Sequence, residues 1–166
     1  NLARTSVTAR VLGQPLLHAG DAAMPEAAGV FVTIKRGGEL RGCLGTLEGD
    51  CRLAEQVVRC AADSASEDPR FAAVSADELP QIRLEVSVLG PLERIEPVPH
   101  AFTIGVHGLV VEQGARRGLL LPQVATEWGW TPEQFLRQTC LKAGLAADAW
   151  QRGAEVYRFA AEVFGD

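Results

Sequence analysis

The most regular pattern in the chain is a strict alternation of apolar and polar positions in residues 82–89. The alternating residues are Ile82, Arg83, Leu84, Glu85, Val86, Ser87 and Val88. Successive side chains on a β-strand point to opposite faces. This segment is therefore predicted to be a strand with one face in the core and one polar face.

A run rich in β-branched residues at 30–35 predicts another strand. The Gly37-Gly38 pair that follows accepts the positive φ angles of a tight turn. Residues 40–47 are therefore predicted to form the return strand of a hairpin.

Helices are predicted at both ends of this hairpin. The spacing of apolar residues indicates an N-terminal helix at residues 2–13. Asp50 is a good N-cap for a helix over residues 51–66, and Pro69 ends it, because the residue before a proline avoids the α region. A capping box at residues 75–78 is expected to open one short helical turn.

The second half of the chain predicts more strands and two more helices. Strands are expected at residues 102–106, 109–113 and 118–121, joined by turns at residues 107–108 and 114–117. A helix should follow Pro122 and stop at Gly129. Thr131 and Gln134 form a capping box that starts another helix, and the last strand is expected at residues 155–164.

Length and charge narrow the class of protein. The 166 residues suit a single domain over residues 1–166 or two closely packed lobes. No apolar run approaches the ~18–20 residues of a membrane span, and no signal-peptide pattern is visible, so we expect a cytoplasmic protein that binds no membrane. The net charge is −5 and the basic residues are dispersed along the chain, so nucleic acid is not an expected ligand.

The spacing of cysteine and histidine argues against a metal centre. The four cysteines contain no C-x-x-C pair, and the three histidines are scattered. Zinc sites usually take closely spaced ligand pairs, so no metal site and no cofactor are expected. Cys60 and Cys140 lie on apolar helix stripes and are expected to be buried in the core.

One segment is unusual for a strand: residues 40–45, Leu40-Arg41-Gly42-Cys43-Leu44-Gly45. Strand glycines usually mark a bulge or the close approach of another group. Arg41 and Cys43 lie two residues apart and so share a face, where the cation could favour the thiolate. The alternative is that Cys43 is a small buried hydrophobic residue. With a two-residue turn, Val32 would oppose Cys43 and Ile34 would oppose Arg41.

Extended by Thr46, this segment resembles the signature L-R-G-C-I-G-T of the AMMECR family, whose prokaryotic members are called AmmeMemoRadiSam system protein A. The resemblance covers residues 29–164, and Leu44 in place of isoleucine is a conservative departure. Further matching segments include Asp68-Pro69-Arg70-Phe71, Glu78-Leu79-Pro80, Glu85-Val86-Ser87-Val88-Leu89 and Cys140-Leu141-Lys142-Ala143-Gly144-Leu145.

The resemblance implies an α+β fold of two packed lobes, with antiparallel β-sheets flanked by helices and both chain ends in the larger lobe. It also implies association with a Memo-type protein and a radical S-adenosylmethionine enzyme. Those partners would carry the metal and iron–sulfur chemistry. It supplies no reaction, and an enzymatic role is suspected in the family mainly because the signature contains the cysteine that is Cys43 here.

Two functional hypotheses remain open. In the first, the chain is a cysteine-dependent enzyme with Cys43 as nucleophile, Arg41 as stabiliser of the thiolate or of an anion, and Glu85 as a base. In the second, which we favour because nothing completes a catalytic constellation, it is a non-catalytic binding or accessory subunit. Residues 40–45 would then contact a partner or a small anionic ligand. The candidate ligand- or partner-binding residues are Gly42, Gly45, Thr46, Arg70 and Gln123.

Overall fold

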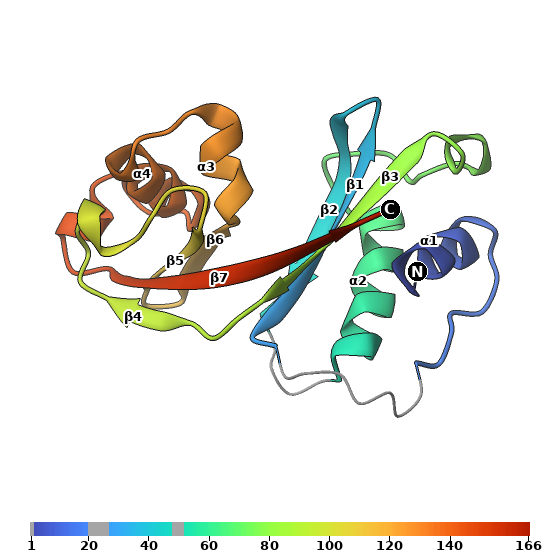
Figure 1. Ribbon diagram of the computed structural model, residues 1–166, viewed down its shortest axis with the longest axis horizontal. Coiled ribbons are helices and arrows are strands. Elements are labelled where there is room, and N and C mark those ends of the chain that lie inside the picture. Colours follow the sequence, from blue (N-terminus) through green and yellow to red (C-terminus); the bar gives the residue numbers. More distant parts are fainter. Residues whose placement is uncertain (1, 20–26, 48–51) are drawn as a thin grey trace. The chain divides into compact units, whose positions relative to one another are not determined.

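The computed structural model describes residues 2–19, 27–47 and 52–166. The chain divides into two compact units: unit 1 comprises Asn1–Leu89 and Glu162–Asp166, and unit 2 comprises Gly90–Ala161. Helices and antiparallel strands occur in both units, and the expected α+β class is confirmed (Figure 1).

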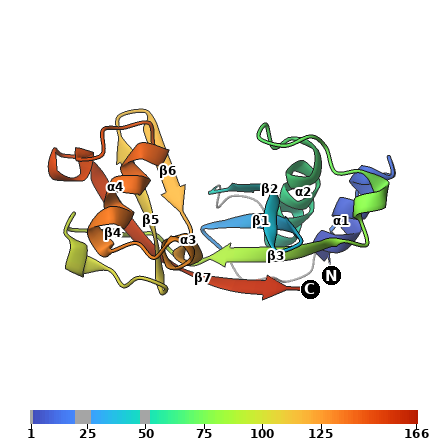
Figure 2. The same cartoon turned by 90° about the horizontal axis from the view of Figure 1, so that it is seen from above.

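Unit 1 is a sheet covered by helices on one face. Its strands are β1 (Gly29–Arg36), β2 (Glu39–Thr46) and β3 (Ile82–Leu89), in the order β2-β1-β3, and the C-terminal end of β7 (Glu155–Gly165) follows β3. The helices are α1 (Leu2–Val11) and α2 (Leu53–Ser66). Figures 1 and 2 show α2 lying along one face of β1 and β2, with α1 beside it.

The core of unit 1 lies between the sheet and α2. Alternate residues of β1, among them Val32 and Ile34, are fully buried and pack against α2, which contributes Val57 and Cys60. The opposite face of β1 carries Phe31, Thr33 and Lys35. The strand predicted at β3 is confirmed at the same bounds, with Ile82 and Leu84 in this core, but Ser87, expected on the polar face, is fully buried.

The β1–β2 hairpin has the predicted turn but not the predicted register. Gly37 and Gly38 take φ angles of 60° and 87°, and Arg36 pairs with Glu39 as a two-residue turn requires. A β-bulge between Ile34 and Lys35 then shifts the pairing by one residue.

Because of this bulge, Thr33 opposes Cys43, and Ile34 opposes Gly42. The predicted pairs of Val32 with Cys43 and Ile34 with Arg41 are therefore wrong. A bulge adds one residue to one strand only, so a register counted outward from the turn fails beyond it.

The helical boundaries of unit 1 follow local signals. Helix α2 ends at Ser66, before Pro69, as predicted, and Arg52 occupies its N-cap position. The predicted cap, Asp50, lies outside the described residues. The capping box at Ser75 and Glu78 is present and opens the short helix η1 (Ala76–Glu78), so this prediction is confirmed.

Unit 2 is a second antiparallel sheet with its own helices. Its strands are β4 (Glu93–Ile95), β5 (His107–Gln113), β6 (Arg116–Leu120) and β7, in the order β4-β7-β5-β6. Helices α3 (Pro122–Trp128) and α4 (Pro132–Lys142) pack on β5 and β6, with the short helices η2 (Pro99–Ala101) and η3 (Ala149–Gln151).

Two predictions in unit 2 are wrong. Residues 102–106 form a turn region after η2 and not a strand, because Phe102 is drawn into the core, where its ring meets Phe135 edge to face. His107 begins β5 and does not sit at a hairpin tip. Strand β4 was not predicted, since its three residues carry no pattern of their own.

The helix signals of unit 2 are confirmed. Gly129 ends α3 in the left-handed region, at φ 63°. Thr131 and Gln134 form the reciprocal capping box of α4, and the buried face of α4 includes Phe135 and Cys140. In the stretches that the structure describes, no helix combines the length and the apolar character needed to cross a bilayer.

Candidate functional site

The candidate site lies on β2, the edge strand of the unit 1 sheet. The hydroxyl of Ser64, on α2, accepts a hydrogen bond from the Leu44 N–H at 2.8 Å and donates to the Val32 carbonyl at 2.8 Å. Leu44 therefore directs its backbone groups toward β1. In an antiparallel pair the neighbouring residues direct theirs the other way, so the N–H and C=O of Cys43 face the outer edge.

Two charged side chains bind these edge-facing groups of Cys43. The Cys43 N–H donates to Asp68 Oδ2 at 2.9 Å, and Arg70 Nη2 donates to the Cys43 carbonyl at 3.2 Å. Asp68 and Arg70 follow the end of α2, where Pro69 prevents the helix from continuing. We call this pair the edge clamp, because it occupies the position that a further strand would take.

The edge clamp is held together by a two-pronged ion pair. Arg70 donates from Nε to Asp68 Oδ1 at 2.9 Å and from Nη2 to Asp68 Oδ2 at 2.7 Å. These hydrogen bonds, chiefly the one from the Arg70 side chain, hold the pKa of Asp68 far below its usual range, against the opposing effect of burial. Asp68 is therefore a permanent carboxylate at physiological pH.

The clamp is polarised with its positive end outward. The Asp68 side chain is 2% exposed, whereas the Arg70 side chain is 49% exposed. Arg70 also lies over the ring of Phe71, 5.5 Å from its centroid. The pair carries no net charge. Because its carboxylate is buried, the part that faces solvent beside Cys43 is a fixed guanidinium.

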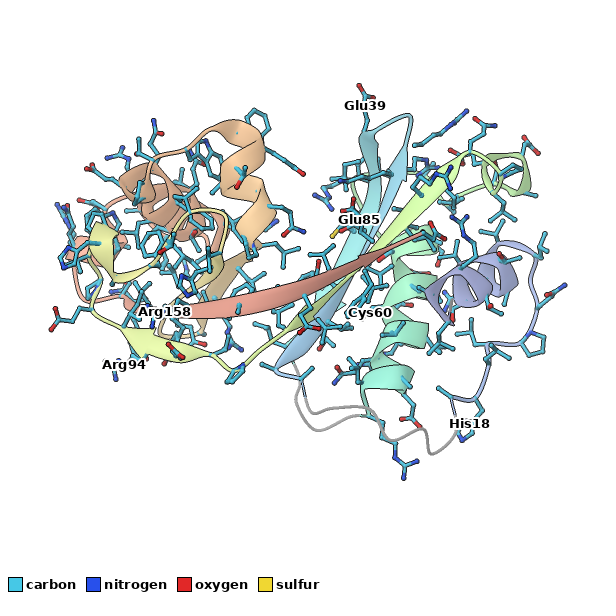
Figure 3. All side chains as sticks on the ribbon, viewed as in Figure 1. His18, Glu39, Cys60, Glu85, Arg94 and Arg158 are labelled. Carbon is cyan, nitrogen blue, oxygen red and sulfur yellow. The ribbon has the colours of Figure 1, made fainter. Side chains whose placement is uncertain are left out.

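The thiol of Cys43 is half-buried and lies on the sheet face that α2 does not cover. Its Sγ is 3.3 Å from Thr33 Oγ1, and either atom can donate. Thr33 also pairs with Glu85 across β3, so the three residues form one row over three strands. Glu85, which Figure 3 labels, accepts a hydrogen bond from Lys35 Nζ at 2.9 Å.

Arg41, which was expected beside the Cys43 thiol, binds Glu78 instead. Its guanidinium donates to both oxygens of Glu78, at 2.8 and 2.9 Å, and to the carbonyls of Ala72 and Ala73. The pKa of Glu78 is lowered to about 2, chiefly by the hydrogen bond from Arg41. Arg41 therefore ties the segment after the clamp to β2. The cation beside Cys43 is Arg70, whose pKa is raised chiefly by its hydrogen bond to Asp68 and, least of all, by the nearby Cys43.

The two glycines of the signature segment (residues 40–45) are required by close contacts. A Cβ on Gly42 would lie 2.3 Å from the carbonyl oxygen of Ser64, on the α2 side of the sheet. A Cβ on Gly45 would lie 2.4 Å from the ring of Phe31, on the other side. The bare strand lets α2 approach one face and an aromatic ring cover the other.

The remaining candidates occupy separate places. Thr46 ends β2 opposite Val30. Gln123 belongs to unit 2, where it is the second residue of α3 and half-buried. Of the candidates named from the sequence, the structure therefore brings Cys43 together with Arg70, and places Glu85 in the same row as Cys43.

Sequence reasoning missed Thr33, Ser64, Asp68 and Glu78 as part of this site. Asp68 and Glu78 carry a signal, since both belong to the segments that resemble the family. Ser64 lies on a helix stripe in a position typical of the core, and its contact with two strands depends on the approach of α2 to Gly42.

Cys60, Cys140 and His107 have structural surroundings. Cys60 is 4% exposed and Cys140 is fully buried, as predicted, and burial raises the pKa of the Cys140 thiol. His107 Nδ1 accepts a hydrogen bond from the Thr103 N–H, which fixes a turn. Across the described ranges, no cluster of three or more His, Cys, Asp or Glu side chains is arranged to hold a metal ion.

The site therefore places the thiol of Cys43 beside the hydroxyl of Thr33 and the outward-facing guanidinium of Arg70. A guanidinium held in this way can bind a carboxylate or phosphate through its remaining N–H donors. A partly exposed thiol beside it can react with an electrophile only to the extent that it ionises.

The chain is similar to several known proteins. The family model AMMECR1 matches residues 1–164. A protein from Methanothermobacter thermautotrophicus is 49% identical over 142 residues, covering 82% of this chain and 74% of its own length. A protein from Methanosarcina mazei is 47% identical over 143 residues, covering 84% of this chain and 72% of its own length.

The structural comparison extends over nearly the whole chain. The crystal structure titled Uncharacterized Protein PH0010, from Pyrococcus horikoshii, superposes with a TM-score of 0.92 at 40% identity, covering 99% of this chain and 88% of that one. The match of the family model over almost all residues, together with relatives at this identity, establishes that the chain belongs to the AMMECR1 family.

Proposed function

We propose that this chain is a non-catalytic binding or accessory subunit that acts with a Memo-type protein and a radical S-adenosylmethionine enzyme. The signature segment, with Arg70 beside it, is its surface for a partner or a small anionic ligand. The free thiols of Cys43, Cys60 and Cys140 suit a reducing compartment, which supports placing this subunit in the cytoplasm.

The observation that carries this proposal is the use of charge around Cys43. Asp68 and Arg70 bind the backbone of Cys43, and Arg41 is engaged by Glu78. These interactions brace an edge strand and present one half-exposed guanidinium. A braced strand with a fixed cation suits recognition, because rigid binding groups lose little entropy when a ligand binds.

The test is co-purification of the chain with the co-encoded Memo-type protein and radical S-adenosylmethionine enzyme. We expect Cys43→Ser to retain partner binding and Arg70→Gln to weaken it at least tenfold. Arg83→Gln, which removes an exposed arginine of β3, is the control and should bind as wild type does. Absence of binding by the wild-type chain to either partner would contradict the proposal.

The alternative function is a cysteine-dependent enzyme with Cys43 as nucleophile. The contact between Thr33 Oγ1 and Cys43 Sγ at 3.3 Å favours it, since a hydroxyl can donate to a thiolate. Arg70, and not Arg41, would then stabilise the thiolate. Glu85 is engaged by Lys35 and would have to leave that ion pair to act as a base.

Alkylation kinetics separate the two functions. A nucleophile activated by Arg70 should react with iodoacetamide at neutral pH several-fold faster than free cysteine, and Arg70→Gln should abolish the difference. We expect instead that Cys43 reacts more slowly than free cysteine in both forms, because its sulfur is half-buried.

A further inference from the structure

Among the described residues, the outer edge of β2 is covered by other groups at one end and not at the other. The edge clamp covers Cys43. Farther toward the start of β2, Arg41 donates hydrogen bonds to the carbonyls of Ala72 and Ala73. Gly45, two residues on, also directs its N–H and C=O to the outer edge, because it has the same parity as Cys43. No described residue bonds to these two edge-facing groups of Gly45.

We propose that this open end of β2 binds the extended C-terminal segment of a protein partner, which pairs with Gly45 and places its terminal carboxylate on Arg70. The inference rests on the proposed function and specifies the kind of partner that the signature segment recognises. An extended peptide that adds to a sheet edge gains affinity from main-chain hydrogen bonds and specificity from alternate side chains.

The closed end of the edge requires the bound chain to stop there. A segment that pairs with Gly45 would meet Asp68 and Arg70 two residues farther along β2, at Cys43, where both backbone groups are already bonded. An internal segment of a partner would have to continue through the clamp. A chain terminus does not.

The charge of the clamp selects which terminus binds. A peptide antiparallel to β2 runs from the Thr46 end toward Cys43, so its carboxylate arrives at Arg70. A parallel peptide would bring its ammonium group there and be repelled. Arg70 donates from Nε and Nη2 to Asp68 and Cys43. The N–H donors of Nη1 remain for the carboxylate.

The face of the strand sets the side-chain preference. Residues directly opposite in an antiparallel pair place their side chains on the same face. The residue that pairs with Gly45 would therefore lie on the side where the Phe31 ring covers that glycine. An apolar side chain at that position of the peptide would pack against the ring.

The experiment is a fluorescence-polarisation titration of the full chain with two matched peptide pools. Each pool is an N-terminally labelled hexapeptide with Gly and Ser at the first three positions and an equimolar mixture of Val, Leu, Phe, Ala and Ser at the last three. One pool has a free C-terminal carboxylate and the other a C-terminal carboxamide.

We expect the carboxylate pool to bind at least tenfold more tightly than the carboxamide pool. Arg70→Gln should remove this difference, and Arg83→Gln should preserve it. Equal binding of the two pools by the wild-type chain, or binding of neither, would overturn the inference. The comparison of pools needs no variant, so a loss of folding in Arg70→Gln cannot produce either result.

The outcome is separable from that of the proposed function. If the Memo-type protein binds and depends on Arg70, but the pools are not distinguished, the subunit role stands and the C-terminal peptide is wrong. If the carboxylate pool is preferred and neither co-encoded partner binds, the peptide site stands and the partners are wrong.

Discussion

The carboxylate of Asp68 accepts a hydrogen bond of 2.9 Å from the backbone N–H of Cys43, across 25 residues of sequence. The main chain of Cys43, the most conspicuous residue of the signature, is thus held by a charged side chain. An unpaired edge strand exposes donors and acceptors that invite other strands, and a buried charge bonded to them removes that exposure. The signature and the Asp68-Pro69-Arg70-Phe71 segment are therefore one structural unit.

Replacing Asp68 by Asn should destabilise the protein by about 2–4 kcal/mol, because Arg70 loses its ionic partner and Cys43 loses a charged acceptor. Asp63→Asn is the matched control. Asp63 is 35% exposed and 3.5 Å from Arg10, so its loss should cost less than about 1 kcal/mol. Urea unfolding at pH 7 measures both, and equal losses would show that the clamp contributes no more than a surface ion pair.

Removing the Ser64 hydroxyl should cost about 1–3 kcal/mol, since Ser64 is 2% exposed and Ser64→Ala leaves the part-buried Leu44 N–H without this acceptor. The control is Ser66→Ala, because Ser66 is half-buried and its hydroxyl bonds the side chains of Arg10 and Glu67, which water can reach. Thermal melts of the two variants decide it. A Ser64→Ala variant that is no less stable than Ser66→Ala would mean that the bridge between β1 and β2 is dispensable.

Valine at Gly42 or Gly45 should destabilise the protein more than Cys43→Ser does. A Cβ at either glycine would fall within 2.4 Å of other atoms, including the backbone oxygens of Ser64 and Val30, which are not free to move. Overpacking of this kind costs about 1–3 kcal/mol or more, whereas Cys43→Ser nearly conserves volume. The free energies of unfolding of the three variants test this order, and a valine variant as stable as wild type would refute it.

The thiol of Cys43 should react with iodoacetamide at least tenfold faster than those of Cys60 and Cys140 in the native protein. Cys43 is half-buried, whereas Cys60 is 4% and Cys140 0% exposed. Peptide mass spectrometry assigns each rate and separates the product of Cys51, which lies outside the described residues. Faster labelling of Cys60 or Cys140 than of Cys43 would contradict the assigned core faces.

The ion pair of Arg41 and Glu78 should make stability depend on pH in acid. The pKa of Glu78 is about 2 in the folded protein against an ordinary 4.5, so its contribution is full above pH 4.5 and is lost as the pH falls toward 2. Glu78→Gln should therefore cost about 2–3 kcal/mol at pH 7 and almost nothing near pH 2.

The control for this pH dependence is Glu39→Gln, at the exposed tip of the β1–β2 hairpin (Figure 3). Its unfolding free energy should match that of wild type at every pH. A Glu78→Gln deficit that persists unchanged to pH 2 would show that the side chain acts through packing and not through its charge.

Local sequence determined most of the secondary structure. The Gly37-Gly38 turn, the bounds of β3 and the capping box at Thr131 all rest on signals within a few residues, so each could be predicted without knowledge of the fold. The signals failed where a distant contact competed. Phe102 left its predicted strand because burial against Phe135 outweighs the strand preference of a short apolar segment.

The sequence by itself also determined that residues 40–45 are special, because two glycines in a strand require a close neighbour on each face. Which neighbours those are was decided only by the tertiary structure. The bulge beside Ile34 set Cys43 against Thr33, and the chain reversal at Pro69 brought Asp68 and Arg70 to the edge of β2. The sequence shows that Asp68 and Arg70 lie two residues apart. It does not show which groups they bind, because that depends on which backbone donors and acceptors the fold leaves in need of a partner.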